Sequence, residues 1–212
     1  KTCGARLTMN YMVPGGVMQE LHPDFQKEVK GFIQLFKSKV HEYDEMVTGN
    51  IIFQNRMKGV GILSKEDAIS FGCTGPTGRG SGVQCDIRKL YPYDAYHKVQ
   101  FDEIIETAGD SLARYMVRIK ELHQSIHIIE QLIDNIPEGD FQAKTKAVLK
   151  LPKGEFYQRV ETARGEFGVY IVSEGGMTPY RIKFRSPGFS NLSALNHMAR
   201  GSKLGDLVAM MG

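Results

Sequence analysis

Apolar residues between positions 103 and 136 recur at steps of three and four, and this periodicity limits the possible folds more than any other feature of the chain. The spacing predicts one amphipathic helix, on the order of 45–50 Å long at 1.5 Å per residue, that Pro137 and Gly139 end. Such a helix buries its apolar stripe against another element. A coiled coil is the alternative, but the stripe is short and broad for one. The stripe consists of Leu112, Tyr115, Met116, Ile119, Leu122, Ile126, Ile129, Leu132, Ile133 and Ile136.

Further helices are indicated before this long one. A second periodic run starts at Asp24 and predicts an amphipathic helix that Gly49 closes. A short helix is expected over 51–57, and Ser64 should open another. The stretch 72–82, GCTGPTGRGSG, should form a tight irregular loop because glycines and a proline dominate it.

The late part of the chain is typical of strands. Runs at 169–172 and 180–185 predict an antiparallel hairpin with a glycine-bearing connection. Apolar and basic residues alternate in the second run, so one face should be buried and the other cationic. Pro187 ends this strand, and Ser190 should cap a helix after it. The apolar members are Tyr180, Ile182 and Phe184, and the basic members are Arg181, Lys183 and Arg185.

These elements predict an α+β fold that is mainly α. We expect a single domain, with a helical core over 1–136 and a β hairpin plus terminal helices over 155–212. Both ends look cut, because Lys1 opens neither a leader nor a start and the last residues follow an apolar helical pattern without a cap. The chain is therefore expected to be a truncated fragment of a longer subunit.

Composition excludes several classes of protein. Hydrophobic residues make up 42% of the 212 residues and charged residues 24%, which is typical of a folded globular chain. The net charge of +3 is far below the dense basic stripe of a duplex-DNA binder, so no nucleic-acid partner is expected. The three cysteines form no C-x-x-C pair, which argues against a disulfide framework and a self-contained metal site.

No complete active site emerges from the residues alone. The loop at 72–82 lacks the order of a phosphate-binding motif, and no strand leads into it. His123 and His127 have the i,i+4 spacing of two metal ligands, but no carboxylate completes the set, so a solvated helix face is favoured. No serine or cysteine lies in a recognisable nucleophile setting.

One cluster near the late strands could carry a function. Because a hairpin returns its two ends to one edge, Arg164, Glu166 and Arg185 should converge. Arginine is a natural donor to anionic or planar acceptor groups. An ordinary partly buried ion pair is the alternative explanation.

Four blocks carry recognisable motifs. They read GARLTMNYMVPGGV, then NRMKGVGILSKEDAISFGCTGPTGRGSGVQCDIRKLYPYDAY, then GDSLARYMVRIKELHQSIHIIEQLIDNIPEG, and finally ETARGEFGVYIVSEGG with PYRIKFRSPGFSNLSAL. In the same order, these blocks resemble the large hydrogenase-like subunit (the D subunit) of respiratory complex I, the NADH:quinone oxidoreductase. The resemblance covers nearly the whole chain.

The resemblance implies a fold and a role. The fold would be the helical core of [NiFe]-hydrogenase large subunits. The protein would pack against a small iron–sulfur subunit that carries a [4Fe-4S] cluster, and would shape the quinone cavity of a proton-pumping enzyme. Further partners would be a neighbouring hydrophilic-arm subunit and a membrane quinone-site subunit. The location would be peripheral, at the cytoplasmic face of the bacterial inner membrane. The chain itself would bind no cofactor and would be inactive in isolation.

The resemblance also assigns candidate residues. Arg164, Glu166, Arg185 and Ser186 align with the wall of the cavity that holds the metal in hydrogenases. Thr8 aligns with a histidine that hydrogen-bonds the cluster in many members. The histidine and tyrosine that contact the quinone headgroup belong to a region not included in this sequence.

Two other interpretations remain open at this stage. A membrane-bound [NiFe] hydrogenase large subunit requires two C-x-x-C pairs, which would lie outside this chain. Ala163 before Arg164 favours complex I, because hydrogenases have proline there. A non-catalytic helical interaction module with a basic face is the second alternative, and its binding would depend on salt.

The threonine at position 8 predicts how the midpoint potential of the adjacent cluster depends on pH. A threonine hydroxyl can donate a hydrogen bond but does not titrate near neutral pH, unlike the histidine of other members. The midpoint potential of the adjacent cluster in the parent enzyme should therefore be nearly independent of pH. A redox titration followed by electron paramagnetic resonance at several pH values measures this, and a steep slope would contradict it.

Overall fold

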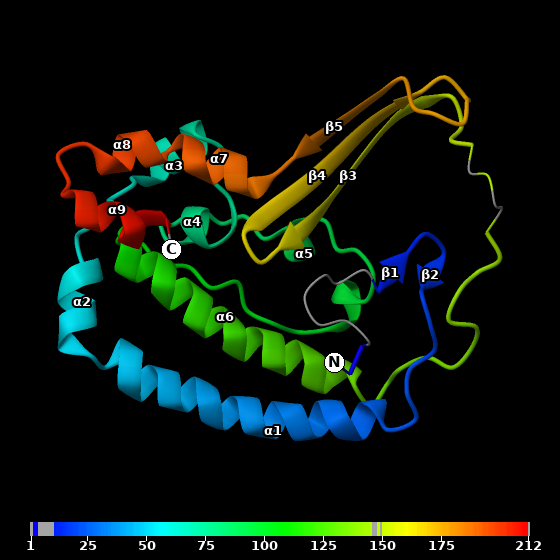
Figure 1. The fold of residues 1–212 in the computed structure, drawn as a ribbon, viewed down its shortest axis with the longest axis horizontal. Helices are drawn as coiled ribbons and strands as arrows, with labels where there is room; N and C mark the ends of the chain where they lie inside the picture. The colour runs from blue at the N-terminus through cyan, green and yellow to red at the C-terminus, as the bar shows by residue number, and fades with distance from the viewer. Residues whose placement is uncertain (1, 4–10, 146–147, 149, 212) are drawn as a thin grey trace.

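The computed structural model describes residues 2–3, 11–145, 148 and 150–211, and the described part mixes helices with a small antiparallel sheet (Figure 1). The expected position of Thr8 lies outside the described residues. The elements are β1 (Met12–Val13), β2 (Gly16–Val17), α1 (Phe25–Tyr43), η1 (Asp44–Thr48), α2 (Ile51–Met57), α3 (Lys65–Ser70), α4 (Gly75–Arg79), α5 (Ile87–Leu90), η2 (Tyr96–Lys98), α6 (Ser111–Leu132), β3 (Gly154–Thr162), β4 (Gly165–Ser173), β5 (Arg181–Arg185), α7 (Pro187–Ser193), α8 (Leu195–Ala199) and α9 (Leu204–Met211).

Helices α1 and α6 lie side by side and run in opposite directions (Figure 1). Their shared apolar face buries Ile33, Val40 and Ile126, as the two apolar periodicities predict. On the rim of this contact Lys37 Nζ lies 2.6 Å from Glu130 Oε1. Two sequence-predicted helices therefore form one half of the molecule.

The long helix is shorter than its apolar pattern suggests. It was expected to begin at residue 103, but α6 begins at Ser111, and residues 103–107 form neither helix nor strand. The Asp110 carboxylate caps the helix by accepting the backbone N–H of Ala113 at 2.8 Å. Its other oxygen accepts the backbone N–H of Gly59, outside the helix, at 2.8 Å. In the segment before the helix, the backbone N–H of Glu106 donates to the carbonyl of Arg79 and that of Gly109 to the carbonyl of Gly80, so these groups do not form a helical turn.

A second apolar cluster joins the glycine-rich segment to the terminal helices. The segment at 72–82 was expected to be an irregular loop, but it contains the five-residue helix α4 and is almost wholly buried. Its neighbours in space are α3 and the terminal helices α7, α8 and α9 (Figure 1). The buried apolar residues of this cluster are Leu63, Ala68, Cys73, Ala194, Met198 and Met210.

The sheet has three strands in the order β3-β4-β5, one more than the expected hairpin. Strand β3 pairs with β4 along its whole length, from Gly154 opposite Ser173 to Thr162 opposite Gly165. Strand β3 has no clear alternation in the sequence, because aromatic, polar and charged residues occupy both of its faces. The expectation that the apolar face of β5 is buried was wrong, because its apolar side chains are exposed.

The first terminal helix starts earlier than expected. It begins at Pro187, directly after Ser186, and not at Ser190. Proline is favoured at the first position of a helix because its missing N–H would have no partner there. Among the described residues, no helix is both long and apolar enough to cross a bilayer.

Arg79, at the end of α4, connects three parts of the chain. Its side chain is 2% exposed and lies 2.9 Å from Glu161 of β3 and 2.7 Å from Glu121 of α6. It also donates to the carbonyl of Cys85 at 3.1 Å. Burial raises the pKa of both carboxyl groups, and the single guanidinium that they share offsets only part of this shift. Sheet, long helix and glycine-rich segment thus share one buried ion cluster.

Replacing Arg79 by alanine should lower the free energy of unfolding by about 3–5 kcal/mol, because two buried carboxylates lose their cation. The loss should shrink as pH falls to about 4.5, since groups whose folded-state pKa is raised become neutral on acidification and cost stability only while they are ionised. Urea unfolding followed by circular dichroism measures both effects. Arg200→Ala, at an exposed arginine, is the matched control. An equal loss in both variants would contradict the role of the cluster.

Candidate functional site

Two neighbouring cavities share a wall made by Arg118 of α6 and Arg164 of the β3–β4 turn. The first has a volume of about 560 Å³ and also contains Arg79, Glu121 and Glu161. The second has a volume of about 440 Å³ and is bounded by the terminal helices. Two arginines from distant parts of the sequence therefore stand where the two spaces meet.

The two cavities differ in chemical character. The first contains several charged side chains besides the shared arginines, whereas five of the ten residues that line the second are methionine or leucine. A ligand with an apolar body and polar oxygen atoms would match the second cavity with its arginine wall. The second cavity is lined by Thr77, Arg118, Arg164, Gly188, Asn191, Leu192, Leu195, Met198, Met210 and Met211.

Arg118 is partly buried and is close enough to Arg164 to feel its positive charge, whereas Arg164 itself is exposed. Burial lowers the pKa of Arg118; the carboxylate of Glu121 opposes this shift, and the charge of Arg164 adds to it. Burial likewise lowers the pKa of Arg114, one turn before Arg118, to about 10. In the described part of the chain, neither Arg118 nor Arg164 forms an ion pair within 4.0 Å. Neither guanidinium is therefore committed to a carboxylate among the described residues, and both can donate to another acceptor.

A contact between two glycines fixes the turn that carries Arg164. Gly165 has φ +123°, and a Cβ atom there would lie 2.5 Å from Thr74 Oγ1 and 2.7 Å from the backbone nitrogen of Gly75. Gly75 has φ +64°, and a Cβ on it would lie 2.5 Å from the Gly165 backbone. Only glycine permits both this backbone conformation and this approach. Asn191 of α7 completes the support by donating to the carbonyl of Arg164 at 3.1 Å.

The predicted convergence of Arg164, Glu166 and Arg185 is only partial. Arg185 donates to the backbone carbonyl of Glu166, to Thr74 Oγ1 at 3.1 Å and to the carbonyl of Gly72 at 2.8 Å. It therefore connects the sheet to the glycine-rich segment and does not line the two shared cavities.

Glu166 and Ser186 also lie away from the two cavities. The Glu166 carboxylate accepts from Arg159 at 3.3 Å and from the hydroxyl of Tyr157 at 3.1 Å. Ser186 precedes α7, and its side chain makes no capping hydrogen bond. Of the expected residues that the structure describes, Arg164 alone lines the shared wall.

Sequence reasoning missed several residues of the site. Arg118, Glu121, Thr74 and Asn191 stood only within the motif blocks, and nothing else in the sequence singled them out. Their spacing in the sequence does not indicate a site, because the fold brings α4 and α6 together with β3 and α7, which lie far from them along the chain. The motif VRIKEL, which contains both Arg118 and Glu121, was the one available indication.

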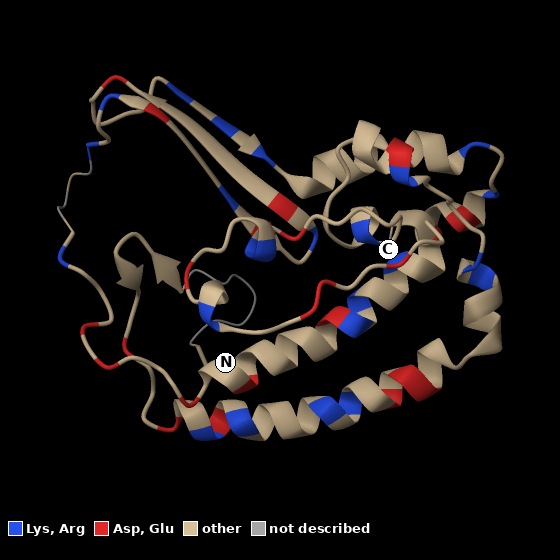
Figure 2. Ribbon diagram, turned by 180° about the vertical axis from the view of Figure 1, so that it is seen from behind, with Lys and Arg blue, Asp and Glu red and all other residues tan. Residues whose placement is uncertain are grey.

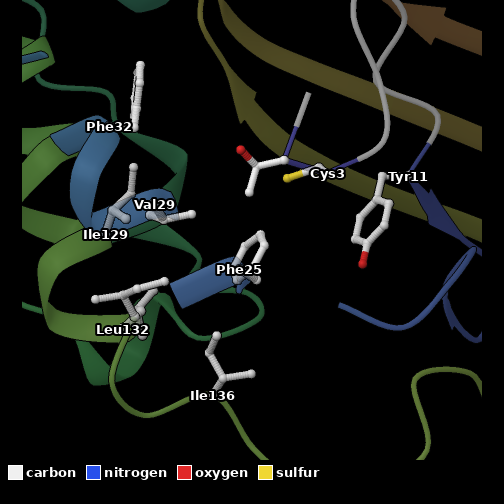
Figure 3. A pocket seen from close by; sticks show the side chains of 10 residues that line it. Cys3, Tyr11, Phe25, Val29, Phe32, Ile129, Leu132 and Ile136 are labelled. Atoms are coloured by element: carbon white, nitrogen blue, oxygen red, sulfur yellow. The ribbon is translucent and has the colours of Figure 1, made fainter. Parts of the chain in front are cut away.

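A separate hollow of about 740 Å³ lies between the first turns of α1 and the last turns of α6 (Figure 3). Figure 3 shows Cys3 and Tyr11 on one side and apolar side chains of both helices on the other. Arg118 lies about 20 Å away from it along α6, at 1.5 Å per residue. No charged side chain lines the hollow, so it offers an apolar surface for binding but no charged group for catalysis. It is lined by Thr2, Cys3, Tyr11, Phe25, Val29, Phe32, Ile129, Leu132, Ile133 and Ile136.

No group of three or more histidine, cysteine or carboxylate side chains is arranged to hold a metal ion within the described ranges. His123 and His127 are both exposed on α6, as expected for a solvated helix face. Cys3, Cys73 and Cys85 are free thiols, and Cys73 is buried.

Replacing Gly165 by alanine should lower the free energy of unfolding by about 3 kcal/mol, because the added methyl group meets backbone atoms in a strained conformation. Gly31→Ala is the control, since no atom lies within 4 Å of the added methyl group there. That change should be neutral or slightly stabilising in a helix interior. Thermal and urea unfolding measure both variants, and equal stability of the two would show that the glycine contact is dispensable.

Comparisons with known proteins agree with the sequence motifs. The family described as "Respiratory-chain NADH dehydrogenase, 49 Kd subunit" matches residues 1–150 and 144–212. The chain is 55% identical over its full length to the NADH-quinone oxidoreductase C/D subunit of Bacteroides fragilis, of which it covers 40%. It is 44% identical to the D 2 subunit of the Solibacter usitatus enzyme, covering 57% of it, and 44% identical to the D subunit of the Bacillus cytotoxicus enzyme, covering 58%. The chain thus spans roughly half the length of these relatives, and it belongs to the family of the 49 kDa subunit of respiratory-chain NADH dehydrogenase.

Proposed function

We propose that this chain is part of the quinone-reducing module of a proton-pumping NADH:quinone oxidoreductase, and that the Arg118–Arg164 wall borders the quinone cavity. The observation that carries this proposal is the pair of arginines without ion-pair partners among the described residues, standing between a cavity with several charged side chains and one half lined by methionine and leucine. The names of the relatives, which are C/D and D subunits of NADH-quinone oxidoreductases, support it.

The geometry suits a quinone because of how charge moves during reduction. Two electrons convert the two carbonyl oxygens to phenolic oxygens, with uptake of two protons, and negative charge develops on oxygen during this process. The guanidinium groups of Arg118 and Arg164 can donate hydrogen bonds to oxygen atoms that bear such charge. The methionine and leucine side chains of the second cavity would contact the apolar ring.

The remaining expectations follow from the same proposal. The fold would be that of the [NiFe]-hydrogenase large subunits, and the chain would pack against an iron–sulfur subunit that carries a [4Fe-4S] cluster. A neighbouring hydrophilic-arm subunit and a membrane quinone-site subunit would complete its surroundings, at the cytoplasmic face of the bacterial inner membrane. The family assignment favours this enzyme over a membrane-bound [NiFe] hydrogenase. The 212-residue chain alone would not reduce quinone.

Arg164→Ala and Arg118→Ala in the parent enzyme should each lower the rate of quinone reduction by NADH on the order of 10²-fold, the usual effect of losing one preorganised donor. Arg164→Lys should recover only part of the rate, because lysine keeps the charge but lacks the forked donors. Electron transfer from NADH to a water-soluble acceptor that bypasses the quinone should stay unchanged.

Arg200→Ala is the matched control, because Arg200 is exposed and lines neither cavity. Assembly of each variant is checked by the amount of intact complex in membranes. Normal quinone reduction in a fully assembled Arg164→Ala enzyme would mean that the arginine has only a structural role.

A further inference from the structure

Strand β5 lies at one edge of the three-stranded sheet. Its inner side pairs with β4, from Gly168 opposite Arg185 to Val172 opposite Arg181. No strand pairs with its outer side in the described part of the chain. One row of backbone N–H and C=O groups along β5 is therefore available to another extended segment.

One face of β5 is cationic. Arg181 and Lys183 are exposed, and neither forms an ion pair with another described residue. Basic residues are spaced along this outer strand, as the blue segments of the ribbon in Figure 2 show. Arg185 differs, because the backbone carbonyls of Gly72 and Glu166 accept its hydrogen bonds. Within the described ranges, the cations of this face without a partner are therefore Arg181 and Lys183.

The cationic face borders a groove of about 490 Å³. Gly168 leaves room for the ring of Tyr157, whose hydroxyl would lie 2.7 Å from a Cβ atom at that position. The tyrosine hydroxyls of this face bind the nearby carboxylates, Tyr157 that of Glu166 and Tyr170 that of Glu155. The acidic groups of the face are thus engaged, whereas its outer cations are not.

The other face of β5 is apolar and uncovered. Ile182 is 44% exposed, Phe184 62% and the preceding Tyr180 73%, although Phe184 stacks on Phe167 with ring centroids 6.2 Å apart. Charged residues at an edge strand commonly serve only to prevent unwanted pairing. That explanation does not account for large apolar side chains exposed on the same strand, because they favour association.

We propose that β5 is a docking edge for an extended segment of a partner protein, which adds a fourth strand to the sheet. The segment would carry acidic residues at alternate positions, facing Arg181 and Lys183, and apolar residues between them, facing Ile182 and Phe184. Five residues of β5 match a segment of about 17 Å. An anionic membrane would match the charges, but it offers no extended backbone for the free edge.

The test measures binding of fluorescent peptides to the 212-residue chain by anisotropy. A peptide of alternating glutamate and valine should bind, and its affinity should fall as salt is raised. A peptide of the same composition with its glutamates grouped together should bind at least tenfold more weakly, because alternation is lost. Methylation of the peptide nitrogens that face β5 should abolish binding, since the strand hydrogen bonds cannot form.

Charge exchange provides the specific control. Arg181→Glu combined with Lys183→Glu should weaken binding of the glutamate peptide about tenfold or more, and should allow a lysine–valine peptide to bind instead. Lys27→Glu combined with Lys58→Glu makes the same change in net charge at exposed positions away from the sheet and should have no such effect. Circular dichroism verifies that both double variants fold.

Several outcomes would overturn the proposal. Equal binding of the methylated peptide would exclude strand pairing, and equal binding of the grouped peptide would exclude alternation. Binding of the chain to vesicles of anionic phospholipid, lost in the Arg181→Glu and Lys183→Glu variant while the peptides fail to bind, would make the face a membrane surface. Dimerisation that the same variant abolishes, again without peptide binding, would make a second copy the occupant. These tests do not depend on quinone reduction and remain valid if the proposed function fails.

Discussion

The arrangement of the molecule depends on the buried guanidinium of Arg79. Two carboxylates from distant elements, the partly buried one of Glu121 and the buried one of Glu161, meet this one cation. A buried ion cluster contributes little to stability compared with apolar packing, but it is intolerant of alternative arrangements because any other register leaves a charge unpaired. The cluster thus specifies how α6 and β3 approach α4. The wall formed by Arg118 and Arg164 follows from that approach, since α6 carries the first arginine and the turn after β3 carries the second.

Several helices could be predicted from the sequence through apolar periodicity, turn residues or a capping residue. The helix that starts at Phe25 and the short helix at Ile51–Met57 agree with their patterns, and Ser64 caps its helix as expected, accepting from the backbone of Asp67. The pattern failed at 103–110, where apolar residues continue the period but backbone bonds hold the segment to other loops. It also failed for β3, because an open sheet buries too little to impose a simple alternation.

The candidate site was only partly visible in the sequence. Arg164 was indicated both by the hairpin that returns its ends to one edge and by the family resemblance, whereas its partner Arg118 is one of many polar residues on a helix. The position of Arg185 near the same edge was predicted correctly, but its donors bind backbone carbonyls, and no pattern of residue types encodes that choice. Contacts made by backbone atoms are the part of a site that sequence motifs describe least well.

The contact between Gly75 and Gly165 has a consequence for how this protein can change over evolutionary time. Most packing contacts can drift, because a larger side chain on one side is compensated by a smaller one on the other. Here both partners already have no side chain, and each faces the backbone of the other. No second-site substitution can make room, so the two positions are locked together. The backbone of the turn that carries Arg164 is therefore conserved because no other residue fits at Gly75 and Gly165, independently of any selection on the arginine.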